Sequence, residues 1–240
     1  MILITRPEVE SVLLAKELSK YNIETCIEPL ISFSHYKNIS FENRPTNYIV
    51  SSKQSVEVLE QNFQKYKKIL EKGNFYIIGK KVTNKLRAMG LVNILGTFEN
   101  SSSLINCLEQ KNFNNYPFVY LCGSIFSNSL IEETKNLGIK LETKFLYETI
   151  QRNKFTNKTL ELIMNKKINA VALYSSYTAK TFVKLVSDSK LTEATQDLQY
   201  FCLSPQIATI LLENQFRRVN CCKSPVQEEM IEMLKAYKII

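Results

Sequence analysis

Tyr48-Ile49-Val50-Ser51-Ser52 and Ala172-Leu173-Tyr174-Ser175-Ser176 share one pattern, in which apolar residues and then two serines precede an amphipathic stretch. The first serines of the two copies, Ser51 and Ser175, are 124 residues apart. Two further pairs follow in the same order: Phe75-Tyr76-Ile77-Ile78-Gly79 with Tyr200-Phe201-Cys202-Leu203-Ser204, and Val92-Asn93 with Val219-Asn220. Matches in one order at nearly constant spacing indicate an internal duplication of strand–turn–helix units.

Short apolar runs and amphipathic stretches alternate along the whole chain. The expected strands are Ile2–Thr5, Glu24–Glu28, Tyr48–Val50, Phe75–Ile78, Phe118–Leu121, Lys140–Lys144, Ala170–Tyr174, Tyr200–Leu203 and Arg218–Cys222. The expected helices are Glu8–Lys20, Gln54–Asn62, Lys81–Met89, Ser102–Gln110, Asn128–Leu137, Asn157–Asn165, Thr178–Ser187, Gln206–Asn214 and Val226–Tyr237. Alternating strands and helices indicate parallel sheets with helices on both faces. We therefore predict an α/β fold with two similar parallel-sheet lobes, flavodoxin-like or Rossmann-like.

The position of the repeats predicts a discontinuous first lobe. The unit that opens at Ile2–Thr5 comes first in the chain, whereas the similar unit at Phe118–Leu121 comes late. We expect lobe 1 to comprise residues 1–32 and 150–240, and lobe 2 to comprise residues 38–144. Residues 31–37 and 144–152 would then be the two crossings, paired as a two-stranded β ribbon that acts as a hinge beside a cleft.

Composition limits the chemistry that the chain can perform. Apolar residues make up 45% and charged residues 22% of the 240 residues, as in ordinary globular proteins. The single histidine, His35, excludes a three-histidine zinc site within one chain, and we expect it to be exposed in the first crossing. The six cysteines form no C-x-x-C pair and are expected to be buried, reduced thiols. The histidine count also excludes an iron site built from two histidines and one carboxylate within one chain.

Charge and hydropathy narrow the classes of partner. The net charge of +8 favours an acidic partner. The basic residues are scattered and no nucleic-acid-binding motif occurs, so an anionic small molecule is favoured over nucleic acid. No apolar run approaches the roughly 20 residues of a membrane-spanning helix. The segment Met1–Glu8 does not resemble a signal peptide, so we expect a cytoplasmic protein without membrane contact.

Polar turns after the expected strands are candidate binding sites. Ligands of open parallel sheets lie beyond the carboxyl ends of the strands, where helix N-termini present free N–H groups and partial positive charge. The candidate residues at this edge are Ser51, Ser52, Lys53, Gly79, Lys80, Lys81, Gly123, Ser124, Ser175, Ser176, Ser204 and Gln206, with Arg6 near the same edge. No phosphate-binding glycine motif occurs among them. A site for a polyanion other than a nucleotide is therefore expected.

These turns and their order resemble the uroporphyrinogen-III synthase family over essentially the whole chain. The resemblance rests on Ile4-Thr5-Arg6-Pro7, Glu28-Pro29-Leu30, Ile49-Val50-Ser51-Ser52-Lys53-Gln54-Ser55-Val56, Tyr76-Ile77-Ile78-Gly79, Leu121-Cys122-Gly123, Phe145-Leu146-Tyr147-Glu148-Thr149, Leu173-Tyr174-Ser175-Ser176, Ser204-Pro205 and Lys223-Ser224-Pro225. The family's fold is two α/β lobes joined by a two-stranded ribbon. Its members close hydroxymethylbilane to uroporphyrinogen III with loss of water and inversion of the last pyrrole ring. They need no metal and no organic cofactor, so the resemblance implies neither for this chain.

The resemblance also implies residue roles. Tyr147 would be the hydrogen-bond donor to the departing hydroxyl group, whereas Ser52 and Ser175 match positions that bind substrate carboxylates. The enzyme would be a monomer, with a transient contact to the preceding enzyme of the pathway. This chain departs from the family at Val82, where threonine is common, and at Gln206 and Ile207 in the second-lobe turn. At these turns we therefore expect backbone N–H contacts, which do not depend on the side chain, rather than threonine hydroxyl contacts.

Two other function classes fit parts of the sequence. A non-enzymatic two-lobed protein that closes on an anionic small molecule would bind tightly without turnover. A basic nucleic-acid-associated protein would show sequence-independent affinity that falls steeply with salt.

Overall fold

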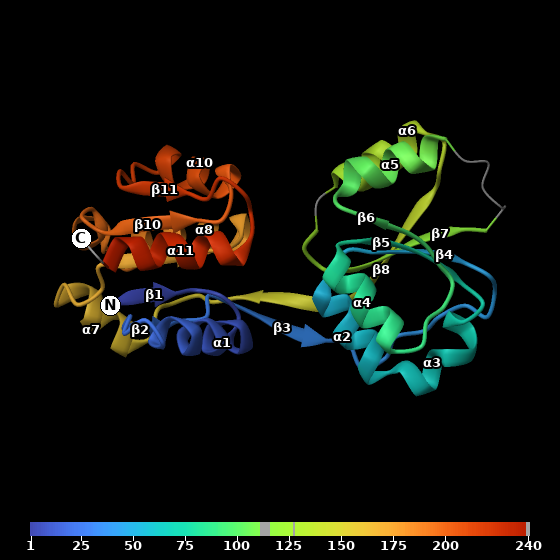
Figure 1. Ribbon diagram of the computed structural model, residues 1–240, viewed down its shortest axis with the longest axis horizontal. Helices are drawn as coiled ribbons and strands as arrows, with labels where there is room; N and C mark the ends of the chain where they lie inside the picture. The colour runs from blue at the N-terminus through green and yellow to red at the C-terminus, as the bar shows by residue number, and fades with distance from the viewer. Residues whose placement is uncertain (111–115, 127, 239–240) are drawn as a thin grey trace. The chain divides into compact units, whose positions relative to one another are not determined.

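The computed structural model describes residues 1–110, 116–126 and 128–238, and these form two β-sheets with helices packed on them (Figure 1). Both sheets are parallel, except for one antiparallel edge strand in the second. Unit 1 comprises Met1–Ser32 and Ile150–Ile240, and unit 2 comprises Phe33–Thr149. Each sheet has a hydrophobic cluster on either face. The predicted α/β class with two parallel sheets is confirmed.

Unit 1 contains a five-stranded sheet in the order β11-β10-β9-β1-β2, whose strands run parallel. The strands are β1 (Ile2–Ile4), β2 (Thr25–Ile27), β9 (Ala170–Leu173), β10 (Gln199–Cys202) and β11 (Val219–Cys221). The helices are α1 (Glu8–Ser19), α7 (Asn157–Met164), α8 (Ser176–Asp188), α9 (Thr192–Thr195), α10 (Pro205–Glu213) and α11 (Gln227–Lys238). Every residue of β1 and β9 is buried, because helices cover both faces of these central strands.

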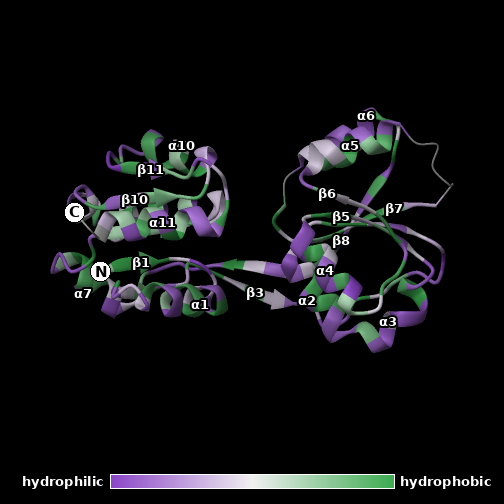
Figure 2. Cartoon of the chain, viewed as in Figure 1, coloured by the Kyte–Doolittle hydropathy of each residue, from purple (hydrophilic) through white to green (hydrophobic). Residues whose placement is uncertain are grey.

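Unit 2 contains a six-stranded sheet in the order β3-β8-β7-β4-β5-β6. The strands are β3 (Ile31–His35), β4 (Asn47–Val50), β5 (Asn74–Ile78), β6 (Ile94–Phe98), β7 (Phe118–Gly123) and β8 (Leu141–Gln151). The helices are α2 (Lys53–Gln61), α3 (Phe63–Leu70), α4 (Lys80–Ala88), α5 (Ser101–Glu109) and α6 (Ser129–Asn136). Figure 2 shows β1 of unit 1 as a hydrophobic strand, whereas α1, α2 and α3 alternate between hydrophobic and hydrophilic residues.

The two sheets repeat one strand order. Read from one side, β11-β10-β9-β1-β2 corresponds to β6-β5-β4-β7-β8, and β3 is the additional strand of unit 2. The N-cap residues Ser52 of α2 and Ser175 of α8 occupy equivalent positions, 123 residues apart. The pairing of Ser51 with Ser175 was therefore wrong by one residue, because β9 ends at Leu173 and Tyr174 belongs to the turn.

The second crossing is part of one long strand rather than a separate ribbon segment. The expected strand at 140–144 and the crossing at 144–152 form the continuous strand β8, which lies beside β3. Tyr36 N–H donates to Leu146 O (3.0 Å) and Arg152 N–H donates to Leu30 O (2.9 Å), so these segments run in opposite directions. β-branched and aromatic residues recur along β8 and favour an extended chain: Thr143, Phe145, Tyr147, Thr149 and Ile150.

Sequence periodicity missed two elements of unit 2, β6 and α3. β6 is a half-buried edge strand that contains Gly96. It is the counterpart of β11, which begins at Val219, so the expected counterpart Val92-Asn93 lies just before the strand rather than in it. Only Asn62 separates α2 from α3, which begins at Phe63. The sequence pattern therefore does not distinguish α3 from the end of the preceding helix. Among the described residues, no helix combines the length and apolar character needed to cross a membrane.

Candidate active site

Two serine–tyrosine pairs join the turn after β4 to other strands of unit 2, namely Ser51 to Tyr120 of β7 and Ser52 to Tyr147 of β8. The Ser51 Oγ atom lies 2.6 Å from the Tyr120 hydroxyl, and the Ser52 Oγ atom lies 2.8 Å from the Tyr147 hydroxyl. Ser52 is also the N-cap of α2, because its Oγ accepts hydrogen bonds from backbone N–H groups in the first turn. The Ser52 and Tyr147 hydroxyl groups therefore lie at the positive end of α2, whereas Tyr120 packs in the hydrophobic cluster on the other face of the sheet.

Tyr147 is held within unit 2 rather than exposed on the ribbon. Its side chain is 6% exposed, and the Phe33 ring packs edge-on against it at 5.4 Å between centroids. Burial raises the pKa of Tyr147 above its usual value, and the hydrogen bond to Ser52 offsets part of that rise. The phenol therefore remains protonated at neutral pH and can donate a hydrogen bond.

Ser124 and Gly123 lie beside Tyr147 at the end of β7. Ser124 N–H donates to the Tyr147 carbonyl at 2.9 Å, and Ser124 Oγ accepts from Thr149 N–H at 3.2 Å. Both residues thus contact β8 rather than facing solvent with free groups. Lys53, the other predicted residue of this edge, is exposed and pairs with Glu57 one helical turn along α2, at 3.6 Å.

His35 is half-buried, so its expected exposure in the first crossing was wrong. Its Nδ1 atom lies 2.9 Å from Gln61 Oε1, and its Nε2 atom lies 3.4 Å from Gln54 Oε1. β3 forms the edge of the unit 2 sheet and presents alternate residues, Phe33 and His35, to one face. His35 therefore lies against α2, where its partner Gln54 is two residues along the chain from Ser52.

The α4 turn presents backbone and charge but no hydroxyl group. Gly79 caps α4 with φ of 102°, a conformation that favours glycine, and Lys80 and Lys81 lie in the first turn. Val82 is buried in the core of unit 2, and the Thr83 hydroxyl lies 3.0 Å from that of Thr97. Val82 has no hydroxyl group to offer at this turn, and the Thr83 hydroxyl is engaged with Thr97.

In unit 1, Arg6 and Tyr174 form a stacked pair at the carboxyl ends of β1 and β9. The Arg6 guanidinium lies 4.3 Å from the centre of the Tyr174 ring, and its Nη1 donates to Gln227 Oε1 at 2.7 Å. In the described part of the chain, Arg6 makes no ion pair and the buried Tyr174 hydroxyl has no hydrogen-bond partner. Burial raises the pKa of Tyr174, and Arg6 offsets part of that rise.

The helix N-termini of unit 1 lie at the same edge. Ser175 caps α8, since its Oγ accepts from Thr178 N–H at 3.1 Å, and Ser176 is the first residue of that helix. Ser204 is the N-cap residue of α10 but makes no side-chain cap hydrogen bond. Gln206 is exposed in the first turn of α10, whereas Ile207 is buried in the core and offers no polar contact.

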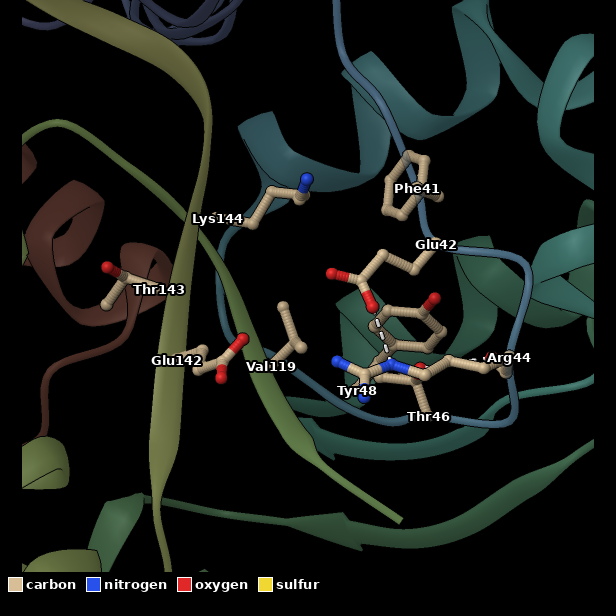
Figure 3. Close-up of a pocket in the computed structure, with 9 residues that line it drawn as sticks. All are labelled: Phe41, Glu42, Arg44, Thr46, Tyr48, Val119, Glu142, Thr143 and Lys144. Atoms are coloured by element: carbon tan, nitrogen blue, oxygen red, sulfur yellow. Dashed lines mark hydrogen bonds and ion pairs between the residues drawn. The ribbon is translucent and has the colours of Figure 1, made fainter.

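A cavity of about 180 Å³ lies at the opposite end of the unit 2 sheet, near the starts of β4 and β7 (Figure 3). Arg44 and Glu42 form an ion pair beside it at 2.6 Å, and Lys144 Nζ donates to the Ser40 carbonyl. These charged groups thus have partners of their own, and the serine–tyrosine pairs lie at the other ends of the strands. Within the described residues, no group of three His, Cys, Asp or Glu side chains could hold a metal ion.

The six cysteines are free thiols, as predicted. Cys26, Cys122, Cys202 and Cys222 are buried, whereas Cys107 and Cys221 are partly exposed. Burial raises the pKa of Cys122 and of Cys202 to about 12, which keeps both thiols protonated and unreactive.

The structure brings together some of the predicted residues and adds others. Ser51, Ser52, Gly123, Ser124 and Tyr147 gather in unit 2. Arg6, Ser175 and Ser176 come from neighbouring strand ends in unit 1, since β1 pairs with β9. Sequence reasoning missed the side chains of Tyr120, Tyr174 and Gln54. The contact of Tyr120 with Ser51 depends on the pairing of β7 with β4, for which the sequence gives no local signal. The contact of Gln54 with His35 depends on the addition of β3 to the sheet.

Comparisons with known proteins agree with these elements. The family model described as uroporphyrinogen-III synthase HemD matches residues 13–232. The structure resembles a uroporphyrinogen-III synthetase from Helicobacter pylori, with 17% identity, a TM-score of 0.67, and coverage of 100% of this chain and 99% of that chain. It also resembles a mutant uroporphyrinogen III synthase from Thermus thermophilus, with 13% identity, a TM-score of 0.61, and coverage of 100% and 98%. A search of curated proteins finds no significant match.

Proposed function

The chain belongs to the uroporphyrinogen-III synthase family, and from that premise we propose roles for the strand-end residues of its two units. It is a lyase of porphyrin and heme biosynthesis that cyclises hydroxymethylbilane to uroporphyrinogen III. The reaction releases water and inverts the last pyrrole ring. The unaided bilane also closes, but without inversion, so the enzyme must hold the chain in a geometry that solution does not favour.

The Ser52–Tyr147 pair supplies the proton donor for the departing hydroxyl group. As the carbon–oxygen bond breaks, the hydroxyl leaves with a proton as water, and the positive charge on the carbon is shared with the pyrrole nitrogen. Tyr147 donates a hydrogen bond to that oxygen, and Ser52 orients the phenol from 2.8 Å. The substituted carbon of the last ring then attacks first, which gives a spiro intermediate that reopens and closes in the inverted sense.

Substrate carboxylates bind at the strand-end turns of each unit. In unit 1, Arg6 provides a cation without an acidic partner among the described residues, beside the N-terminus of α8. Ser175, Ser176 and Ser204 add N–H or hydroxyl groups, and Gln206 lies at the same turn. In unit 2, substrate carboxylates bind mainly to backbone N–H groups and to positively charged side chains. The residues that provide these groups are Ser51, Lys53, Gly79, Lys80 and Lys81.

We also propose that the enzyme works as a cytoplasmic monomer and meets the preceding pathway enzyme transiently. The substrate cyclises unaided, so a short transfer distance would limit loss to the non-inverted product. Light scattering of the purified protein tests the first part, since a mass near 27.8 kDa is expected for a monomer.

The observation that carries this proposal is the hydroxyl pair at the α2 N-terminus. Tyr147→Phe removes one hydroxyl, and we expect formation of uroporphyrinogen III to fall about 100-fold while type I product accumulates. Tyr120→Phe is the matched control, because it removes the hydroxyl bonded to Ser51 at 2.6 Å. We expect that variant to retain turnover within about threefold of wild type. Equal rates for Tyr147→Phe and wild type would contradict the donor role.

A further inference from the structure

Gly123 lies so close to the Tyr147 ring that a side chain at position 123 would force the ring to move. A Cβ atom at Gly123 would lie 2.4 Å from Tyr147 Cε2 and 2.5 Å from Cζ, with the hydroxyl oxygen at 2.9 Å. Gly79, Gly90 and Gly138 have positive φ values, but Gly123 does not, so its backbone conformation does not call for glycine. The requirement at this position is space for the tyrosine ring.

A β-bulge turns Tyr147 toward that space. Cys122 pairs with Phe145 and Gly123 pairs with Tyr147, so Leu146 is an extra residue in β8. Leu146 and Tyr147 therefore both pack in the hydrophobic cluster on the α2 face, although neighbours on a regular strand face opposite sides. The bulge directs the Tyr147 side chain toward this face, and the absence of a side chain at Gly123 leaves room for its ring.

The ring is held by two neighbours. Gly123 lies close to its hydroxyl-bearing end, and Phe33 packs edge-on against it from β3. The backbone of Tyr147 is fixed by the bond from Ser124 N–H to its carbonyl, 2.9 Å long. In this position the hydroxyl reaches Ser52 Oγ at 2.8 Å. Movement of the hydroxyl away from Ser52 by about 1 Å would break that hydrogen bond.

We infer that Gly123 is a positioning residue for the reaction, which sets the Tyr147 hydroxyl against Ser52 instead of contacting the substrate itself. This inference rests on the role proposed for Tyr147. It replaces the sequence-derived expectation that Gly123 binds substrate. The effect of a side chain at position 123 must then run through the Tyr147 hydroxyl.

Gly123→Ala tests the inference, with Gly73→Ala as its matched control. A Cβ at Gly73 would meet the Tyr48 ring at 2.5 and 2.7 Å, which is a similar steric conflict in the same unit. Tyr48 lies near the start of β4 and lines the cavity at the opposite end of the sheet (Figure 3). Both variants should lower the denaturation midpoint of unit 2. Only Gly123→Ala should lower kcat, by about tenfold or more, with KM within about threefold and more type I product.

The double variant Gly123→Ala/Tyr147→Phe separates positioning from other roles. With the hydroxyl already absent, alanine at position 123 should cost less than about twofold in kcat relative to Tyr147→Phe alone. An equal loss in both backgrounds would overturn the inference, because Gly123 would then act independently of the hydroxyl. Wild-type kcat and isomer ratio for Gly123→Ala would overturn it as well.

A second variant covers the case in which Gly123→Ala does not fold. Phe33→Leu removes the edge contact on the ring without adding a clash, and should lower kcat in the wild-type background but not in Tyr147→Phe. Unchanged kcat for folded Phe33→Leu would contradict the requirement for a fixed ring. Failure of the wild-type protein to form type III product would instead overturn the proposed function, so the two failures are distinguishable.

Discussion

The turn after β4 in unit 2 and the turn after β9 in unit 1 occupy the same place in the repeated sheet, but they differ in chemistry. After β4, the Ser51 hydroxyl is paired with Tyr120 of the neighbouring strand β7, and the Ser52 hydroxyl with Tyr147 of β8, the strand beyond β7. After β9, the Tyr174 hydroxyl has no partner among the described residues, and Arg6 stacks on its ring. The cap at the helix N-terminus is common to both units, whereas the groups around it are not.

The two units also differ at β2 and β8, which occupy equivalent positions two strands away from β9 and β4. β2 is followed by Glu28, a buried carboxylate that accepts hydrogen bonds from Thr156 N–H (3.2 Å), from Thr156 Oγ1 (2.5 Å) and from Thr159 Oγ1. β8, its counterpart in unit 2, carries Tyr147 instead. Unit 1 thus uses its edge strand β2 to hold α7, whereas β8 in unit 2 carries the residue proposed as the proton donor. The two sheets share one strand order but differ in the groups that these two strands present.

The largest effect is expected from removing the Glu28 carboxylate. Glu28→Ala removes three hydrogen bonds to a buried carboxylate, and at about 1 kcal/mol for each, unit 1 should lose about 3 kcal/mol. Alkylation of buried thiols during urea unfolding reads each unit separately, with Cys202 reporting unit 1 and Cys122 reporting unit 2. Cys202 should become reactive at lower urea, while the midpoint for Cys122 should not move.

Glu24→Ala is the matched control, because Glu24 is an exposed glutamate just before β2. It should leave both thiol midpoints within about 0.5 kcal/mol of wild type. Equal shifts of Cys122 and Cys202 in Glu28→Ala would contradict the separation of the two units into independent cores.

Removing the guanidinium group of Arg6 in unit 1 should affect substrate binding more than the chemical step. Arg6→Gln should raise KM about tenfold with kcat within about threefold, since Arg6 is proposed to bind a carboxylate that is charged throughout the reaction. Arg218→Gln is the control in the same unit, because Arg218 lies near Asp197 at 3.8 Å and is exposed. A fall in kcat without a change in KM would contradict the binding role of Arg6.

The two helix caps sharpen the comparison further. Ser52→Ala and Ser175→Ala should each cost about 1 kcal/mol of stability in their own unit, through loss of the N-cap hydrogen bonds. Because Ser52 also orients Tyr147, its variant alone should increase the fraction of type I product. Chemical denaturation and isomer analysis of both variants measure the two effects. Equal isomer fractions in the two variants would show that the Ser52–Tyr147 bond has no catalytic consequence.

The smallest effect concerns pH. The pKa of Tyr147 is raised by burial, so the phenol should stay protonated from about pH 7 to 9 and its contribution should not titrate there. The ratio of wild-type to Tyr147→Phe rates should therefore remain constant across this range, which cancels the titration of other groups. A ratio that falls toward 1 at the upper end would indicate that the hydroxyl loses its proton within the range.

Sequence patterns predicted the strands that are buried on both faces and the helices that follow them, because continuous apolar runs and capping residues are local signals. They did not predict β6, a half-buried edge strand interrupted by Gly96. The repeat was found but placed one residue out of register, since Tyr174 resembles a strand residue in sequence and lies beyond the end of β9.

The serines of the candidate site were proposed from the sequence and Tyr147 from the family resemblance, but the contacts that hold these residues were not predicted. The serines follow strand ends, which places them at one edge by topology. The Tyr120 and Phe33 contacts depend on strand order and on the addition of β3 to the sheet, and neither is encoded locally. The role of Gly123 depends on a bulge in β8, for which no sequence signal was apparent.

An isomer assay of the wild-type protein tests the central claim most directly. Hydroxymethylbilane is generated in situ, the purified protein is added, and the oxidised products are separated as type I and type III uroporphyrins. The account predicts that type III predominates and that its share rises with enzyme concentration. Only type I product, from protein shown to be folded by protection of Cys122 and Cys202, would contradict it.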